Sequence, residues 1–292
     1  GTIGGQAFKY ITKDSKKWYL IDNADQLMAV ATGVNGTTTP DGSNYARTYN
    51  FILMKDVNLN SSSPAAASGK KGATSNGSWS SSSYTSWTPI GTNSYAYTGT
   101  FEGNNHIISG LGKLRGTDGV GLFGVIGANG EVSHLGIGFG QILASGKRRV
   151  GALAGINNGA ISSCWSMAEI QVAGSVVGGL VGENTGSMTN VYCVGLILQA
   201  SDTIGVLVGR NSGTITNAYT AGYARNGNAF VGVDANGTYV QCYTDRQLYY
   251  QEPGFVGAGM QPLDNTTLLF SLFQSNSAWV NNAGLYPMLA GF

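Results

Sequence analysis

The sequence predicts an all-β fold, a right-handed parallel β-helix (β-solenoid), formed by a single domain over residues 1–292. Three observations predict it. Glycine makes up 45 of the 292 residues, about twice its usual share of about 7 %, and most of these glycines lie between positions 110 and 240. Within that stretch the glycines recur at a fixed period, and apolar residues recur in phase with them. Such a period is typical of a repeat architecture.

The repeats run over residues 119–245. Two glycine columns mark each repeat, namely Gly124, Gly155, Gly182 and Gly209, then Gly130, Gly159, Gly186 and Gly213. The last two intervals of the first column are 27 residues, and the first is 31. A unit of this size is shorter than a helix pair of about 34 residues and fits one coil of a solenoid. The glycines are expected at bends, where a positive φ or a close backbone approach is needed.

Three apolar columns are expected inside the coils. They are Leu122, Leu153, Leu180 and Leu207; Val132, Ile161, Met188, Ile215 and Tyr239; and Leu135, Cys164, Val191, Ala218 and Cys242. Stacking places each column in one ladder at a strand spacing of about 4.8 Å. The same phase makes Glu183 and Arg210 cross-coil neighbours.

A bend is expected between the second and third columns, because their odd separation cannot lie on one face of a regular strand. The residues at this bend are His134, Ser163, Asn190, Asn217 and Gln241. Short and amide side chains of this kind bond to backbone in turns and to one another between coils. A structural role is expected for them.

An aromatic column follows, and it supplies the candidate ligand-binding residues Trp165, Tyr192, Tyr219 and Tyr243. Because the preceding column faces inward, these rings are expected to face outward. Two interpretations remain open. The rings stabilise neighbouring strands by packing on one another, or they form an exposed surface on which sugars or a partner stack.

The flanking segments are expected to cap the solenoid, whose open ends would otherwise expose unpaired strand edges. A short amphipathic helix is predicted over residues 22–34, beginning with a capping-box-like pair, Asn23 and Gln26, and ending at Gly33 or Gly36. A strand is predicted over 49–60, and a serine-rich surface insertion over 61–86. The apolar residues 262–292 are expected to close the last coil as a C-terminal cap.

Composition excludes several functions. The formal net charge is +1, so there is no basic excess for a nucleic-acid partner. No apolar run approaches the 18 or so residues of a membrane-spanning helix. The three cysteines, 164, 193 and 242, lie at irregular spacing without a CxxC motif, which predicts buried side chains and neither a disulfide framework nor a zinc site. No metal and no cofactor are expected.

Catalytic residues are not predicted. Glycoside cleavage needs two carboxylates roughly 5 to 9.5 Å apart, yet Glu169 shares its column with Leu196 and Tyr223 and stands alone. Asp118 and Glu102 flank the first coil and are expected to be solvated turn residues. His106 and His134 are 28 residues apart, about one coil, but they lack a third ligand or a partnered acid.

The strings GALAGINNGAI, GGLVGENTGSMTNVY and GVLVGRNSGTITNAY resemble the GLUG repeat of bacterial surface proteins with adhesin-like character and of some large secreted peptidases. NADQLMAVATGVNG, FILMKDVNL, WTPIG with YTGTFEGNNHIISGL, and the terminal W with LYPML extend the similarity over residues 18–290. The first repeat is longer, and the fifth lacks the Leu-Val-Gly core. The resemblance implies a solenoid scaffold, carries no catalytic residues, and implies an extracellular or cell-surface location.

The expected function is therefore a non-enzymatic, adhesin-like or binding module of an exported bacterial cell-surface protein. Its expected partners are a glycan or a host or bacterial surface protein, and a monomer is expected. Two alternatives stay open: a carbohydrate-active β-helix enzyme, either a polysaccharide lyase or a hydrolase, and a passive structural spacer.

Overall fold

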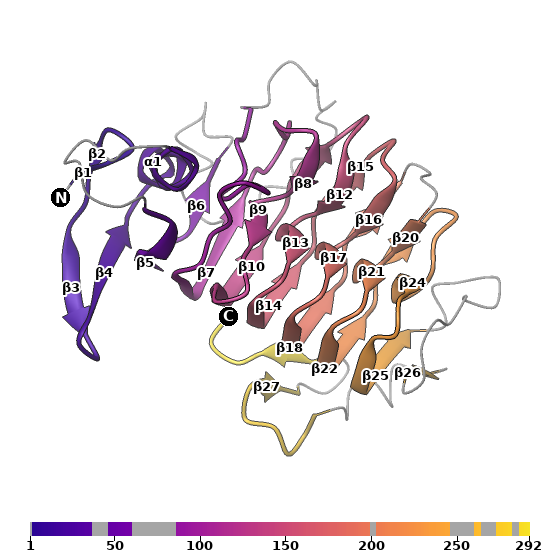
Figure 1. Cartoon of the computed structure of the whole chain (residues 1–292). Coiled ribbons are helices and arrows are strands. Elements are labelled where there is room, and N and C mark those ends of the chain that lie inside the picture. Colours follow the sequence, from indigo (N-terminus) through magenta and orange to yellow (C-terminus); the bar gives the residue numbers. More distant parts are fainter. Residues whose placement is uncertain are drawn as a thin grey trace, which may run out of the picture.

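The computed structural model describes residues 2–36, 46–59, 86–198, 203–245, 260–263, 273–281 and 286–292. In these residues the chain is a parallel β-solenoid, as the sequence predicts. Successive coils stack along one axis, with the N-terminal strands at one end and the last repeats at the other (Figure 1).

Four sheets run along the solenoid, and each of the four coils over residues 118–143, 148–171, 176–197 and 203–224 contributes one strand to each of them. The main sheet contains β7 (Thr100–Ser109), β10 (Glu131–Ile137), β14 (Ala160–Ser166), β18 (Ser187–Cys193), β22 (Thr214–Thr220) and β25 (Thr238–Asp245). A second contains β9 (Phe123–Ile126), β13 (Ala154–Asn157), β17 (Val181–Asn184), β21 (Val208–Asn211) and β24 (Val231–Asp234). A third contains β8 (Asp118–Val120), β12 (Arg148–Gly151), β16 (Val176–Gly178) and β20 (Thr203–Gly205). The fourth contains β11 (Gln141–Leu143), β15 (Glu169–Gln171), β19 (Leu196–Ile197) and β23 (Tyr223–Ala224).

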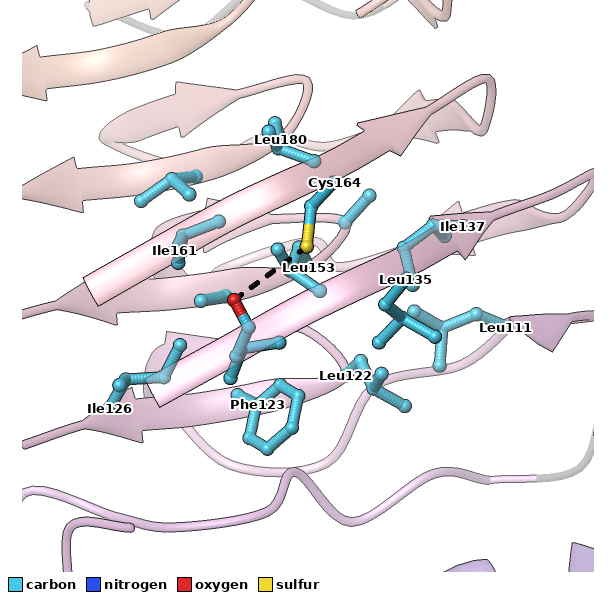
Figure 2. Close-up of a cluster of buried hydrophobic side chains, with 14 of the residues drawn as sticks. Leu111, Leu122, Phe123, Ile126, Leu135, Ile137, Leu153, Ile161, Cys164 and Leu180 are labelled. Carbon is cyan, nitrogen blue, oxygen red and sulfur yellow. Dashed lines mark hydrogen bonds between the residues drawn. The ribbon is translucent and has the colours of Figure 1, made fainter. Parts of the chain in front are cut away.

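The register of the coils confirms the predicted columns. In the main sheet Leu135 pairs with Cys164, and the column continues through the following coils to Cys242. Val132 likewise begins a paired column that ends at Tyr239. Both columns are buried, together with the leucine column at the start of each repeat (Figure 2). Each rung thus covers the apolar surface of its neighbour.

The predicted bend is a column of left-handed residues. His134, Ser163, Asn190, Asn217 and Gln241 have φ values of 49, 52, 54, 53 and 52°. Asparagine tolerates this region better than most residues because its short side chain bonds locally. The Asn217 amide donates to Asn190 Oδ1 at 3.2 Å, which confirms the hydrogen bonding between coils.

The glycine columns are explained by close approach. A Cβ at Gly155 would lie 2.1 Å from the backbone nitrogen of Val120, and one at Gly186 would lie 2.0 Å from the carbonyl oxygen of Gly159. Neither glycine has a positive φ. Of the two reasons expected for glycine at these bends, the packing of one backbone on the next is the one that applies.

A buried asparagine ladder was not predicted. Asn157 donates from Nδ2 to Asn184 Oδ1 at 2.8 Å, and Asn184 donates to Asn211 Oδ1 at 2.7 Å. All three side chains are fully buried. The ladder satisfies polar groups that would be costly to bury alone. Its signal in the sequence is the asparagine two residues before Gly159, Gly186 and Gly213.

The N-terminal end carries the predicted helix, α1 (Ala24–Asn35) (Figure 1). Asn23 caps it by accepting from the backbone nitrogen of Gln26, and Gly36 follows its last residue. Leu27, Val30 and Val34 are buried in the core. The helix contacts β1 (Thr2–Ile3), β2 (Gln6–Ala7) and the 3-10 turn η1 (Ala46–Thr48). The strands β4 (Lys16–Ile21) and β3 (Tyr10–Lys13) form the N-terminal end of the main sheet.

Two flanking segments differ from their predictions. The strand expected over 49–60 is divided into β5 (Asn50–Leu53) and β6 (Val57–Asn58). The serine-rich insertion predicted over 61–86 falls, apart from Ser86, outside the described residues. Of the described residues in the predicted cap over 262–292, those at the end of β26 (Met260–Leu263) pair with β25 beyond the last coil. Among the other described residues of that segment are β27 (Trp279–Val280) and β28 (Met288–Leu289), and β27 lies beside β18 and β22 (Figure 1).

Candidate functional site

The aromatic column forms in the predicted register. Trp165 pairs with Tyr192, Tyr192 with Tyr219, and Tyr219 with Tyr243. The rings of Trp165 and Tyr192 stack with centroids 5.8 Å apart, and those of Tyr192 and Tyr219 with centroids 5.0 Å apart. The alternation of the strands turns these rings away from the core inside the coils.

The aromatic column is not an exposed surface, which corrects that interpretation. Trp165, Tyr192 and Tyr219 are 7 %, 7 % and 1 % exposed, and Tyr243 is half-buried against the same cluster. We call residues 273–281 and 286–292 the covering segment, because their side chains pack on the column: Phe273, Trp279, Tyr286, Leu289 and Phe292. The physical reason is the large apolar area of stacked rings, which is removed from water when a second layer covers it.

Hydrogen bonds anchor the covering segment. The Tyr219 hydroxyl donates to the carbonyl oxygen of Pro287 at 2.7 Å, and the Trp279 indole donates to Asn190 Oδ1 at 3.1 Å. The Tyr286 hydroxyl donates to a carboxylate oxygen of Asp245. Burial raises the pKa of the Tyr219 hydroxyl well above its usual value. The tyrosines of this interface therefore act as neutral donors.

A different face carries exposed apolar residues. We call the outer face of the β11, β15, β19 and β23 sheet the lateral face. Four of its residues form what we call the lateral patch, namely Phe139, Met167, Leu196 and Tyr223, which are 60 %, 39 %, 42 % and 40 % exposed. The register places Leu196 directly beside Tyr223. Phe139 and Met167 lie two residues before Gln141 and Glu169, respectively, in the connections that enter β11 and β15, so they border the strands of this sheet.

Glu169 lies in the lateral face among these apolar residues. It pairs with Gln141 on one side and Leu196 on the other, as predicted for its column. Its Oε1 atom accepts from the side-chain amides of Gln141 at 2.8 Å and Gln171 at 2.7 Å. No lysine, arginine or histidine of the described residues pairs with this carboxylate. The sequence predicted the column of Glu169, Leu196 and Tyr223 but not the lateral patch. The signal of the patch in the sequence is a large apolar residue next to each of the small residues Gly140, Ala168, Gly195 and Gly222.

The two histidines each have an acidic partner, which sequence reasoning missed. His134 Nδ1 lies 3.1 Å from Glu102 Oε2, and His106 Nδ1 lies 3.2 Å from Asp56 Oδ1. The hydrogen bond with Glu102 raises the pKa of His134. Burial favours the protonated form of Glu102, but hydrogen bonds from His134 and from the backbone of Asn104 hold its pKa below the usual value. The partners are 32 and 50 residues apart in sequence, so no spacing motif reveals them.

This arrangement does not activate a nucleophile. Ser133 Oγ donates to Glu102 Oε2 at 3.0 Å, the same oxygen that contacts His134. In a serine–histidine–acid triad the histidine lies between the other two, because it must remove the hydroxyl proton. Here the carboxylate lies between the serine and the histidine, so the histidine is not placed to act as a base for Ser133.

Charged residues along one corner form a chain across coils. Arg149 contacts the carboxylates of Asp118 and Glu183, and Arg210 Nη1 lies 3.1 Å from Glu183 Oε1. The pair of Glu183 and Arg210 confirms the predicted register. Asp118 and Glu102 take different partners in different sheets, so they do not form a carboxylate pair.

The cysteines and the candidate metal ligands offer no further site. Cys164, Cys193 and Cys242 are buried, as predicted, and unbridged. Burial raises the pKa of the Cys164 thiol to about 12, which keeps it protonated and unreactive. In the described ranges no cluster of three His, Cys, Asp or Glu side chains is arranged to hold a metal ion, and no helix has the length and apolarity to cross a membrane.

Comparisons with known proteins identify a shared fold and one partial relative in sequence. No family model matches the sequence. A "putative Gly-rich membrane protein" of Evansella cellulosilytica is 34 % identical over 118 residues, which cover 39 % of this chain and 12 % of that protein. The chain thus matches a small part of that relative's length. The crystal structure of a "putative immunoglobulin A1 protease from Bacteroides ovatus" superposes with a TM-score of 0.57 at 17 % identity, covering 96 % of this chain and 94 % of that one. At this identity the likeness shows a shared fold.

Proposed function

We propose that the chain is a non-enzymatic, adhesin-like binding module of an exported bacterial cell-surface protein, and that its solenoid presents a surface for a glycan or protein ligand. The observation that carries the proposal is the lateral face. It keeps four large apolar side chains exposed in adjacent coils, although the chain covers its other outward apolar column. Exposed patches of this kind mark interaction sites.

The cell-surface location is part of the proposal. It is supported by the resemblance to GLUG-repeat surface proteins and by the name of the Evansella relative, which describes a membrane protein. A rigid stack of coils suits this role, because each coil contacts only its neighbours and the whole provides an extended surface.

Proteolysis is the second candidate, and the name of the Bacteroides protein, a protease, favours it. It would require a nucleophile and base in contact. Among the described residues Ser133 and His134 are neighbours in sequence, but both are bound to Glu102. The geometry therefore supports binding over cleavage.

The test is binding measured alongside turnover. The purified chain is applied to a glycan array and to a panel of purified extracellular-matrix and bacterial surface proteins. Reducing ends and peptide fragments are then assayed after incubation with each captured ligand. We expect saturable binding without product, and the same binding by Glu102→Gln and His134→Asn. Product formation that these variants abolish would establish an enzyme, and the absence of any binding would leave a passive spacer.

A further inference from the structure

We propose that the lateral face docks an apolar protein segment that carries one lysine or arginine side chain beside Glu169. This inference rests on the proposed function and names the partner class of the same face. Three observations support it: the grouping of the apolar residues, the carboxylate without a cation among them, and the peptide segment that covers the adjoining face.

The apolar residues of the lateral patch are grouped. Single exposed apolar residues are normal on a protein surface. Val233 of β24 and Val240 of β25 are of that kind, 41 % and 46 % exposed and each on a different sheet. The lateral patch differs because its Phe, Met, Leu and Tyr side chains come from four successive coils. Leu196 and Tyr223 are paired in the sheet, and Phe139 and Met167 lie in the connections that lead into it. Aromatic residues and Met are enriched where proteins meet.

Glu169 defines the charge of the partner. Two amides donate to Oε1, which fixes the orientation of the carboxylate. A partner that excludes water from this face would bury the negative charge of Glu169, and burying a charge is costly without a counter-charge. A lysine or arginine on the partner supplies the counter-charge together with a charge-assisted hydrogen bond to the carboxylate. Charge complementarity thus selects a cationic side chain at this point.

The adjoining face shows that an apolar peptide segment fits here. Val194 and Ala221 occupy the positions of Phe139 and Met167 in the next two coils, two residues before Leu196 and Tyr223. Both pack against the cluster that the covering segment closes. This column is therefore already covered by a peptide segment at its C-terminal coils and is exposed at its N-terminal coils. The aliphatic centre of the patch, Met167 and Leu196, also favours apolar side chains over a sugar ring, which would stack on aromatic faces.

The test uses a random dodecapeptide phage library, selected against the immobilised full chain. We expect enriched peptides to combine apolar residues with one lysine or arginine. The peptide most enriched is then measured by fluorescence anisotropy. Glu169→Gln should weaken binding about tenfold, the size of one charge-assisted hydrogen bond, and should remove the preference for a cation in a repeated selection. Met167→Ser combined with Leu196→Ser should abolish measurable binding.

The matched control is Val233→Ser, which removes an equally exposed apolar side chain from another face and should leave affinity within about twofold. Unchanged melting temperatures would show that the variants are folded. Three results would overturn the inference: enriched peptides without a cation, affinity insensitive to the double substitution, or a glycan that binds and depends on the same residues. In each case the proposed function stands if the wild-type chain still captures a ligand in the array experiment, and fails separately if it captures none.

Discussion

Tyr219 and Tyr223 lie four residues apart in one coil, yet one is 1 % exposed and the other 40 %. The first belongs to the aromatic column on the main sheet, and the second to the lateral patch on the neighbouring sheet. The aromatic column is closed by the covering segment, while the lateral patch faces solvent. Outward-facing apolar residues of this chain are therefore buried under the covering segment on one face and exposed to solvent on another.

The composition of the two faces explains that difference. The aromatic column is a continuous stack of large rings, and covering them removes much apolar area from water. The lateral face interrupts its apolar residues with Glu169 and two glutamines, and a carboxylate resists burial without a cation. The aromatic column thus completes the fold, whereas the lateral patch stays exposed.

The largest expected effect is a difference between matched substitutions. Tyr219→Ala should lower the free energy of unfolding by about 3 kcal/mol or more, because it opens a cavity in the covered cluster. Tyr223→Ala should lower it by less than about 1 kcal/mol, because the side chain is partly hydrated. Urea unfolding monitored by circular dichroism measures both. Equal losses would contradict the distinction between the two faces.

A smaller effect tests how closely the covered column is packed. The Trp165 indole lies over Gly136, where a Cβ would come within 2.5 Å of the ring. Gly136→Ala should therefore cost about 1–3 kcal/mol in unfolding free energy by overpacking. In a Trp165→Leu background the same change should cost clearly less, since the clashing ring is gone. An equal cost in both backgrounds would show that the indole is not the cause.

The smallest expected effect on stability comes from the ion pair of Glu102 and His134, which belongs to neither the aromatic column nor the lateral patch. The pKa of His134 is raised from 6.5 and that of Glu102 is lowered from 4.5. The contribution of His134 to the free energy of unfolding is complete below pH 6.5 and is lost as the pH rises through the raised pKa of the folded state. The contribution of Glu102 to the free energy of unfolding is complete above pH 4.5 and is lost as the pH falls through the lowered pKa of the folded state.

The pair should therefore stabilise the fold most between about pH 4.5 and 6.5, by less than about 1 kcal/mol because it is partly exposed. His134→Asn keeps a residue suited to the left-handed bend and removes the charge. Unfolding free energies of both proteins across this pH range measure the difference. A difference that grows above pH 8 would contradict the assignment.

The repeats made most of the fold predictable from sequence. Each column recurs several times, so the phase of Leu135, Cys164 and Val191 fixes the register without knowledge of distant contacts. The covering segment occurs once and has no period. Its anchors join residues far apart, such as Tyr219 with Pro287 and Asn190 with Trp279, at separations of 68 and 89 residues. The sequence therefore predicted which rings face outward but not what lies on them.

The candidate site shows the same division. Glu169, Leu196 and Tyr223 could be placed in one column from their phase alone. Whether that column is exposed depends on which face the covering segment packs against. That packing is set by contacts between residues far apart in sequence, so the repeat phase does not predict it. The ion pairs of His134 and Arg149 were missed for a related reason. The repeat phase predicts neighbours within one column, whereas these two residues contact Glu102, Asp118 and Glu183 across columns.

The asparagine ladder gives the stack a direction. The amides of Asn157 and Asn184 each donate to the asparagine of the next coil, and the Asn211 amide donates to the carbonyl oxygen of Gly213 in its own coil. In the following coil the paired position is Asp234, whose Oδ1 atom accepts from the backbone nitrogen of Gly237 and the hydroxyl of Tyr239. A carboxylate has no proton to donate, so the ladder of amides is not continued at Asp234. The coils of Asn157, Asn184 and Asn211 thus share one direction of side-chain donation, and the coil of Asp234 does not continue it.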